Sequence, residues 1–229
     1  MTEPRGALAP LPDRRSAGER LAARLVSYRD QDPVVLALPR GGVPVAFEIA
    51  QVLGAPLDIL IVRKVGAPSN PEYGLGAVVE GGSRFLDEPR VRAAGYTLRA
   101  LGPTIAREVA EVERRAMEYR AGRPALELRG RTVILVDDGV ATGGTVLAAL
   151  RTIRARGPRR VVLALGVAPP DTVAILRPDV DDLVVLLQPE VFFAVGEWYH
   201  RFSQVSDEEV RQFLERGRVT PSPEPDELT

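Results

Sequence analysis

The stretch Val133-Ile134-Leu135-Val136-Asp137-Asp138-Gly139-Val140-Ala141-Thr142-Gly143-Gly144-Thr145 joins an apolar run to two acids and a turn of small residues. The apolar run predicts a buried strand, and the turn predicts the start of a helix. Backbone N–H groups, two hydroxyls and the helix dipole at such a turn suit a phosphate monoester. The carboxylates of Asp137 and Asp138 suit the hydroxyls of a pentose. The stretch therefore predicts a site for ribose 5-phosphate, with a capped helix after an acidic turn as the alternative.

Apolar strands alternate with helical segments on both sides of this stretch. Strands are predicted over residues 34–38, 57–62, 132–136, 161–167 and 183–187, and helices over residues 13–28, 43–53, 97–119, 146–156, 171–176 and 207–216. Continuous apolar strands separated by helices are typical of a parallel sheet covered on both faces. The predicted fold class is therefore α/β, with a central parallel sheet flanked by helices.

The chain is expected to form one domain over residues 1–218 with an insertion at about residues 66–119. The start of this insertion is rich in Gly and Pro and holds short β-prone pieces, which predicts a hairpin or a flexible loop. Residues 219–229 are rich in proline and acids, which predicts a disordered tail.

Composition excludes several classes of function. The chain has no cysteine and a single histidine, His200, which rules out disulfides and thiolate nucleophiles and disfavours a Ser-His triad. Its net charge of −1 gives no general electrostatic reason to expect nucleic acid as a partner. Apolar runs are too short for a membrane span and the N-terminus lacks a signal-peptide core. We therefore expect a cytoplasmic protein without a membrane or nucleic-acid partner.

Ligands of parallel sheets lie beyond the carboxyl ends of the strands, near the point where the strand order reverses. The turn Arg40-Gly41-Gly42 follows the first predicted strand, and its glycines allow backbone N–H groups to face an anion; an ordinary turn is the alternative. Lys64 follows the next strand and is the only lysine in the chain. A mobile point charge there could neutralise a departing anion, although a solvated surface lysine is an equal alternative.

The thirteen residues from Val133 to Thr145 resemble the PRPP-binding motif of the type I phosphoribosyltransferases, where PRPP is 5-phosphoribosyl 1-pyrophosphate. The order of elements resembles that family over residues 34–187. The resemblance implies a pyrophosphate-binding loop after the first core strand, a flexible catalytic loop and a C-terminal hood over the acceptor. It implies Mg²⁺ as the cofactor, held largely by substrate and water, with contact to the Asp137 and Asp138 carboxylates as an option.

Roles follow by position in the motif. The resemblance implies that Asp137 and Asp138 hold the ribose hydroxyls and act in catalysis together with Lys64. The 5′-phosphate would be held by Gly139, Ala141, Thr142, Gly143, Gly144 and Thr145, and the pyrophosphate by Arg40, Gly41, Gly42 and Lys64. Trp198 and Tyr199 are the hood candidates because aromatic faces stack on bases, with core packing as the alternative.

The expected reaction transfers the phosphoribosyl group of PRPP to a nitrogen acceptor, with a nucleobase favoured, and releases pyrophosphate. Ala141 stands where the hypoxanthine-guanine enzymes of the family have an aspartate, which weakens a 6-oxopurine assignment, and the acceptor stays open. The rivals are a PRPP-binding regulatory protein without turnover and an α/β phosphatase or kinase that uses the acid pair for a metal. Family members are often dimers, so a homodimer is one expectation.

Overall fold

The computed structural model describes residues 8–217, and its central sheet has five parallel strands. The tail predicted over residues 219–229 lies outside the described residues. The strand order is β2-β1-β6-β7-β8. The bounds are β1 (Pro33–Ala37), β2 (Leu57–Ile59), β6 (Thr132–Gly139), β7 (Arg160–Val167) and β8 (Asp182–Leu187). The prediction of a parallel sheet is confirmed.

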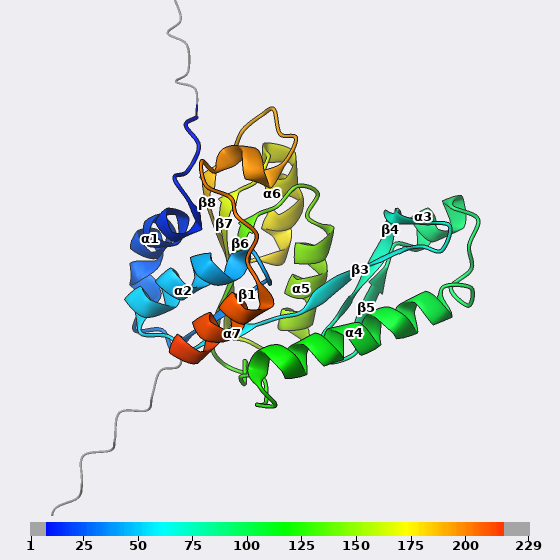
Figure 1. Cartoon of the computed structure of the whole chain (residues 1–229), viewed down its shortest axis with the longest axis horizontal. Coiled ribbons are helices and arrows are strands. Elements are labelled where there is room, and N and C mark those ends of the chain that lie inside the picture. The colour runs from blue at the N-terminus through cyan, green and yellow to red at the C-terminus, as the bar shows by residue number, and fades with distance from the viewer. Residues whose placement is uncertain (1–7, 218–229) are drawn as a thin grey trace, which may run out of the picture.

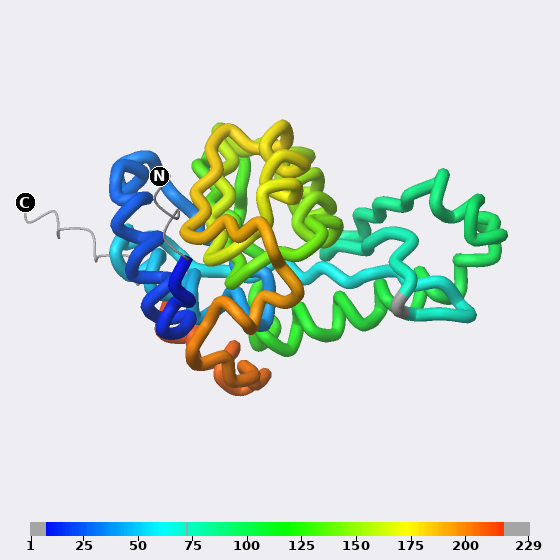
Figure 2. The backbone as a smooth tube through the Cα atoms, turned by 90° about the horizontal axis from the view of Figure 1, so that it is seen from above, coloured from blue at the N-terminus to red at the C-terminus, as the bar shows by residue number. Residues whose placement is uncertain are grey.

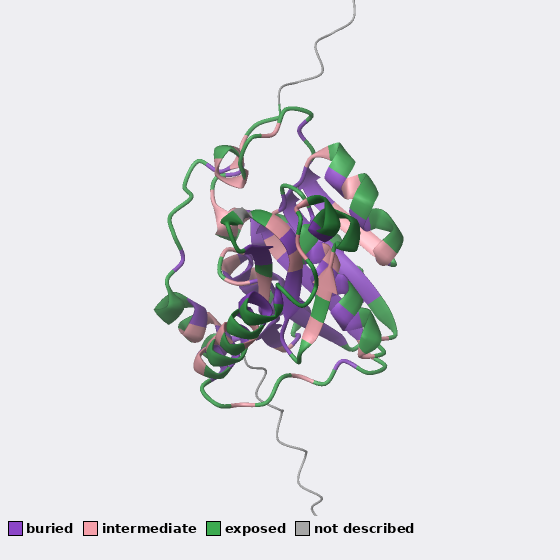
Figure 3. Cartoon of the chain, turned by 90° about the vertical axis from the view of Figure 1, so that its right-hand side faces the viewer, coloured by how far each residue is buried: buried purple, intermediate pink, exposed green. Residues whose placement is uncertain are grey.

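Helices cover both faces of this sheet (Figure 1). The helices α1 (Arg14–Leu25), α2 (Gly42–Leu53) and α7 (Asp207–Arg216) lie on one face, and α5 (Gly144–Ala155) and α6 (Pro170–Leu176) on the other. Period-two alternation divides each strand between two apolar cores: Val35 packs in the core of α1 and α2, and Val34 in the core of α5. Figure 3 shows the buried residues gathered on the sheet and the inner helix faces.

Short 3₁₀ turns complete the central part: η1 (Val26–Tyr28), η2 (Arg177–Asp179) and η3 (Val195–Trp198). In residues 8–217, no helix combines the length and the apolar character that a membrane crossing requires.

Residues 62–120, which we call the arm, project to one side of the central sheet (Figures 1 and 2). The arm consists of an antiparallel sheet β3-β4-β5 with the helices α3 and α4. The bounds are β3 (Val62–Ala67), β4 (Asn70–Val79), β5 (Ser83–Leu86), α3 (Glu88–Ala93) and α4 (Gly102–Arg120). The region predicted as a hairpin or a loop is thus a three-stranded sheet.

Two predicted boundaries near the arm are wrong. The strand predicted over residues 57–62 ends at Ile59, and Val62 opens β3 of the other sheet, where it pairs with Val79. No Gly or Pro marks this break. The helix predicted from residue 97 begins at Gly102, because residues 97–101 form turns. Pro103 in its first turn is a start signal that should have placed this boundary later.

A buried ion network fixes the root of the arm. The Arg120 guanidinium at the end of α4 donates to Asp58 of β2 at 2.7 Å, to the carbonyl oxygen of Ile59 at 2.7 Å and to Glu80 after β4. Asp58 also accepts a hydrogen bond from the N–H of Leu126 at 3.0 Å. All three charged residues are buried. Each charge has lost its hydration, and only the ion pairs and hydrogen bonds with its partners compensate for that loss.

Arg120→Met is therefore expected to destabilise the fold by about 3–5 kcal/mol, since it leaves two buried carboxylates without their cation. The measurement is the free energy of unfolding in urea. The same substitution at Arg92, whose ion pair with Glu88 is exposed, is expected to leave it nearly unchanged. An equally small effect at Arg120 would show that the network does not hold the arm.

Candidate functional site

The strand order places two loops of different origin side by side. The chain runs from β1 outward to β2 and later returns to the other side of β1 as β6, so the order reverses between β1 and β6. These two strands pair in parallel from Pro33 with Thr132 to Ala37 with Val136. Their carboxyl ends therefore open the crevice in which ligands of such sheets bind.

The glycine turn after β1 packs directly against the acid pair after β6. A side chain on Gly41 would place its Cβ 2.1 Å from Oδ2 of Asp138, and one on Gly42 would place it 2.7 Å from the carbonyl oxygen of Val136. The N–H of Leu38 donates to that same carbonyl oxygen at 3.0 Å. The structure thus brings the predicted anion-binding turn and the predicted ribose-binding acids together.

The two acids differ in environment. Asp138 is buried, and its main-chain carbonyl oxygen accepts the Tyr199 hydroxyl at 2.5 Å. Asp137 is half-buried, and its Oδ1 accepts the N–H of Asp138 at 2.9 Å. Burial raises the pKa of the Asp137 carboxyl well above 3.8, and the neighbouring Asp138 carboxylate raises it further. Such a perturbed acid in a cleft is typical of a functional site.

Asp137→Asn is expected to raise stability relative to the wild type at high pH. A carboxyl whose pKa is raised by folding binds more protons in the folded state, so its contribution to stability is complete below 3.8 and is lost as the pH rises through the folded pKa. The asparagine side chain stays neutral at every pH, so the variant does not lose this stability as the pH rises. Unfolding midpoints measured from pH 8 down to pH 4 should show an advantage of the variant that shrinks as the pH falls, and an advantage that grows instead would refute the assigned direction.

The turn after β6, Gly139 to Thr145, which we call the cradle, is held in place by contacts to β7 and α6. The N–H of Val140 donates to the carbonyl oxygen of Val167 at 2.9 Å, and the carbonyl oxygen of Ala141 accepts the Thr172 hydroxyl at 2.6 Å. Gly143, the N-cap of α5, then adopts φ +78°, a left-handed conformation that only glycine takes without cost. The adjoining residues Thr142, Gly144 and Thr145 are exposed, so the donors of this helix start are open to a ligand.

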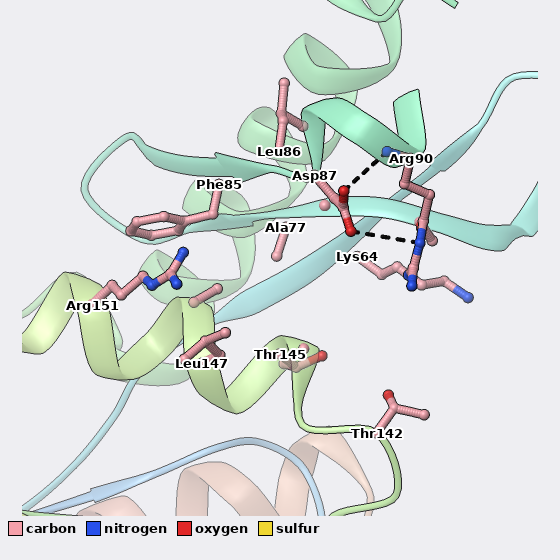
Figure 4. A pocket seen from close by; sticks show the side chains of 14 residues that line it. Lys64, Ala77, Phe85, Leu86, Asp87, Arg90, Thr142, Thr145, Leu147 and Arg151 are labelled. Carbon is pink, nitrogen blue, oxygen red and sulfur yellow. Dashed lines mark hydrogen bonds and ion pairs between the residues drawn. The ribbon is translucent and has the colours of Figure 1, made fainter. Parts of the chain in front are cut away.

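Lys64 lies in the arm rather than at the edge of the central sheet. It pairs with Ala77 in the β3-β4 hairpin, and it lines a cavity of about 380 Å³ between the arm and α5. Thr142 and Thr145 line the same cavity, as do Arg90 and Arg151 (Figure 4). The structure therefore places Lys64 beside the cradle, and its role toward pyrophosphate stays a prediction.

The side chain of Arg40 is paired with Asp207 of α7 at 3.6 Å. The hydroxyl of Tyr119 also donates to Asp207, so α4, α7 and the glycine turn meet there. The peptide bond between Pro39 and Arg40 is cis.

The two hood candidates are not equivalent. Tyr199 is 5% exposed, and its hydroxyl reaches the space that Gly166 leaves beside Asp138. Core packing, the alternative that the sequence left open, therefore describes the Tyr199 side chain, and its place in a hood stays a prediction. Trp198 is half-buried, and its indole nitrogen is buried without a hydrogen-bond partner in the structure. Phe193, on the loop after β8, is 81% exposed and offers a ring for stacking.

Sequence reasoning missed one residue of the site, Arg14. Its Nε donates to Oδ2 of Asp138 at 2.7 Å, across 124 positions of the chain, and both side chains are largely buried. Arg14 is one arginine among many in α1 and its neighbours, and no spacing distinguishes it. Only the packing of α1 against the central sheet brings it to the acids.

The chain is similar to known proteins over most of its length. A family model described as "Phosphoribosyl transferase domain" matches residues 5–199. A Mycobacterium tuberculosis protein named "Putative phosphoribosyl transferase" is 47% identical over 205 residues, which are 90% of this chain and 46% of that protein. The chain thus spans about half the length of the curated relatives it matches.

The chain is also similar to a solved structure over most of its length. The crystal structure of TT1426 from Thermus thermophilus is 46% identical, with a TM-score of 0.78, and the match covers 90% of this chain and 98% of that one. Among the curated proteins, a Methanopyrus kandleri ribose-phosphate pyrophosphokinase is 32% identical over 139 residues, and the match covers 51% of this chain and 46% of that protein.

Proposed function

Because the chain belongs to the phosphoribosyl transferase domain family, we propose that it transfers the 5-phosphoribosyl group of PRPP to a nitrogen acceptor and releases pyrophosphate. One observation supports the proposal: Gly41 of the turn after β1 packs against Asp138 of the acid pair at the end of β6, directly before the cradle that leads into α5. With these roles a diol site would lie between two anion sites, as the ribose of PRPP lies between its 5′-phosphate and its pyrophosphate.

The proposed roles follow this order along the site. Asp137 and Asp138 accept hydrogen bonds from the ribose hydroxyls. The cradle from Gly139 to Thr145 holds the 5′-phosphate through backbone N–H groups and hydroxyls at the start of α5. The turn Arg40-Gly41-Gly42 holds the pyrophosphate, and Lys64 adds a positive charge from the arm.

Two adjacent carboxylates are hard oxygen donors, the kind that Mg²⁺ prefers, so the acid pair fits a Mg²⁺ ion that arrives with PRPP. In residues 8–71 and 73–217, no three His, Cys, Asp or Glu side chains converge as a ligand set. When bound, the ion would neutralise charge on the pyrophosphate. Asp137 and Asp138 are the residues that would hold it together with substrate oxygens.

In the proposed reaction the bond between C1 of the ribose and the pyrophosphate oxygen breaks, and its electron pair leaves with the pyrophosphate. The lone pair of the acceptor nitrogen forms the new bond to C1, and the acceptor gives up a proton. Positive charge develops on the sugar, and the nearby carboxylates stabilise it. The β3-β4 hairpin of the arm is the element that would shield C1 from water. Phe193, more exposed than Tyr73 or Phe202, is the aromatic ring proposed to stack on an acceptor base.

The test is pyrophosphate release from PRPP and Mg²⁺ with a panel of acceptors: adenine, guanine, hypoxanthine, xanthine, uracil, orotate and simple amines. One acceptor should stimulate pyrophosphate release, and mass spectrometry should detect the phosphoribosyl derivative of that acceptor. PRPP binding without turnover on any acceptor would point to the regulatory protein instead. Hydrolysis of phosphate esters without PRPP would point to a phosphatase.

A further inference from the structure

Arg14 is held rigidly at the start of α1. The Asp13 side chain caps this helix by accepting the N–H of Ser16 at 2.8 Å. The Arg14 guanidinium then makes three contacts: Nε donates to Asp138 at 2.7 Å, Nη1 donates to the carbonyl oxygen of Ser203 at 2.6 Å, and Cζ lies 3.8 Å from the centre of the Phe202 ring. The contacts with Ser203 and Phe202 hold the guanidinium beside Asp138, so exchanging the Asp138 contact for one with a ligand costs little conformational entropy.

The contact atom on Asp138 is also the one that faces the glycine turn. Oδ2 of Asp138 receives the Arg14 Nε–H, and the same oxygen lies 2.1 Å from where a Cβ of Gly41 would be. Arg14 and the backbone of Gly41 therefore converge on one point. The guanidinium of Arg40, by contrast, is paired with Asp207. Arg14 is thus the arginine bonded to the acid pair beside the predicted pyrophosphate turn.

Arg14 takes one acceptor position of the carboxylate that is proposed to bind ribose, because its Nε–H points at Oδ2 of Asp138. A ribose hydroxyl that donates to this oxygen from the same side competes with Arg14. Pyrophosphate carries more negative charge than a carboxylate, and the planar guanidinium fork matches phosphate oxygens in a bidentate way. When PRPP binds at the turn, its pyrophosphate would lie close to the Arg14 guanidinium and would compete with Asp138 for it.

On the basis of the proposed function, we propose that Arg14 is a pyrophosphate-binding residue that exchanges Asp138 for the pyrophosphate of PRPP. The exchange frees Oδ2 of Asp138 for a ribose hydroxyl as the pyrophosphate gains a cation. Binding of one half of PRPP therefore prepares the site for the other half. Free pyrophosphate should depend on Arg14 in the same way, whereas ribose 5-phosphate, which has no pyrophosphate, should not.

The experiment measures the affinities of PRPP, pyrophosphate and ribose 5-phosphate by calorimetry with Mg²⁺. Arg14→Gln should weaken PRPP and pyrophosphate by at least about 10-fold, because each charge-assisted contact is strong. Its affinity for ribose 5-phosphate should be unchanged or higher, since Oδ2 of Asp138 is free. Arg14→Lys keeps the positive charge but lacks the planar guanidinium. Its affinities for PRPP and pyrophosphate should lie between those of the wild type and Arg14→Gln. Arg15→Gln, an exposed arginine on the same helix, should match the wild type.

The outcomes separate this inference from the function on which it rests. If the wild type binds no PRPP, both are wrong. If the wild type binds PRPP, and both Arg14 variants bind PRPP and pyrophosphate as tightly as the wild type does, this inference alone fails. An equal loss of all three ligands would also overturn it, because that pattern indicates a structural role. Thermal unfolding of each variant checks the fold, and Arg14→Lys decides the matter if Arg14→Gln does not fold.

Discussion

The double variant Asp137→Asn/Asp138→Asn is expected to bind PRPP at least about 100-fold more weakly than the wild type, because two charge-assisted hydrogen bonds to the ribose become neutral ones. The backbone of both residues stays in β6, so the cradle after the strand keeps its position. The loss should therefore fall on ligands that contain the ribose. Calorimetry with PRPP and Mg²⁺ measures it, and inorganic pyrophosphate should retain binding through the turn after β1.

A matched control for this variant exists at the start of β8. Asp181 and Asp182 are also adjacent acids, but they lie at the amino end of that strand, where Asp181 accepts the N–H of Val161 at 2.6 Å. Asp181→Asn/Asp182→Asn should bind PRPP like the wild type. If the two double variants lose PRPP affinity equally, the acid pair after β6 has no specific role. Unchanged affinity in Asp137→Asn/Asp138→Asn would reject the assigned ribose site.

Gly41→Ala is expected to lower PRPP affinity by about 100-fold, a loss of about 2.7 kcal/mol. The backbone of Gly41 has φ −60°, which any residue can adopt, so the requirement is for space. The new Cβ would lie 2.1 Å from Oδ2 and 2.6 Å from Cγ of Asp138. Either the turn or the carboxylate must move, and both are needed for PRPP. Overpacking of this kind also costs about 1–3 kcal/mol of stability.

The control is Gly102→Ala at the start of α4, where a Cβ would meet nothing within 4 Å. It should leave both PRPP affinity and stability at wild-type levels. PRPP affinity in Gly41→Ala equal to that in Gly102→Ala would show that the contact between the turn and Asp138 does not matter for binding.

Local patterns were sufficient to predict the central sheet. The apolar run before Asp137 predicted β6 and the turn of small residues predicted α5, because burial and turn chemistry act over a few residues. The predicted strand ended at residue 136 and the predicted helix began at residue 146, whereas β6 ends at Gly139 and α5 begins at Gly144. The rule for the carboxyl ends of parallel strands then placed the turn at Gly41 beside the acids, and the contact with Asp138 bears this out.

The residues that the sequence misplaced depend on packing between distant elements. Lys64 was assigned to the edge of the central sheet, but the chain passes into the arm at Val62 without a Gly or Pro to mark the change. For Tyr199 the sequence left a hood and core packing open, and only its contact with the distant Gly166 favours core packing. Arg14 reaches Asp138 only because α1 packs on the same face of the sheet as α2. Periodicity carries no information about such long-range contacts.

The most direct test of the central claim is the titration of the wild-type chain with PRPP in the presence of Mg²⁺, beside separate titrations with ribose 5-phosphate and pyrophosphate. We expect PRPP to bind in a single saturable step and more tightly than ribose 5-phosphate or pyrophosphate. The reason is that PRPP would contact the cradle, the acid pair and the glycine turn together, whereas each fragment would contact only some of them. The absence of PRPP binding, or binding no tighter than that of ribose 5-phosphate, would contradict the claim.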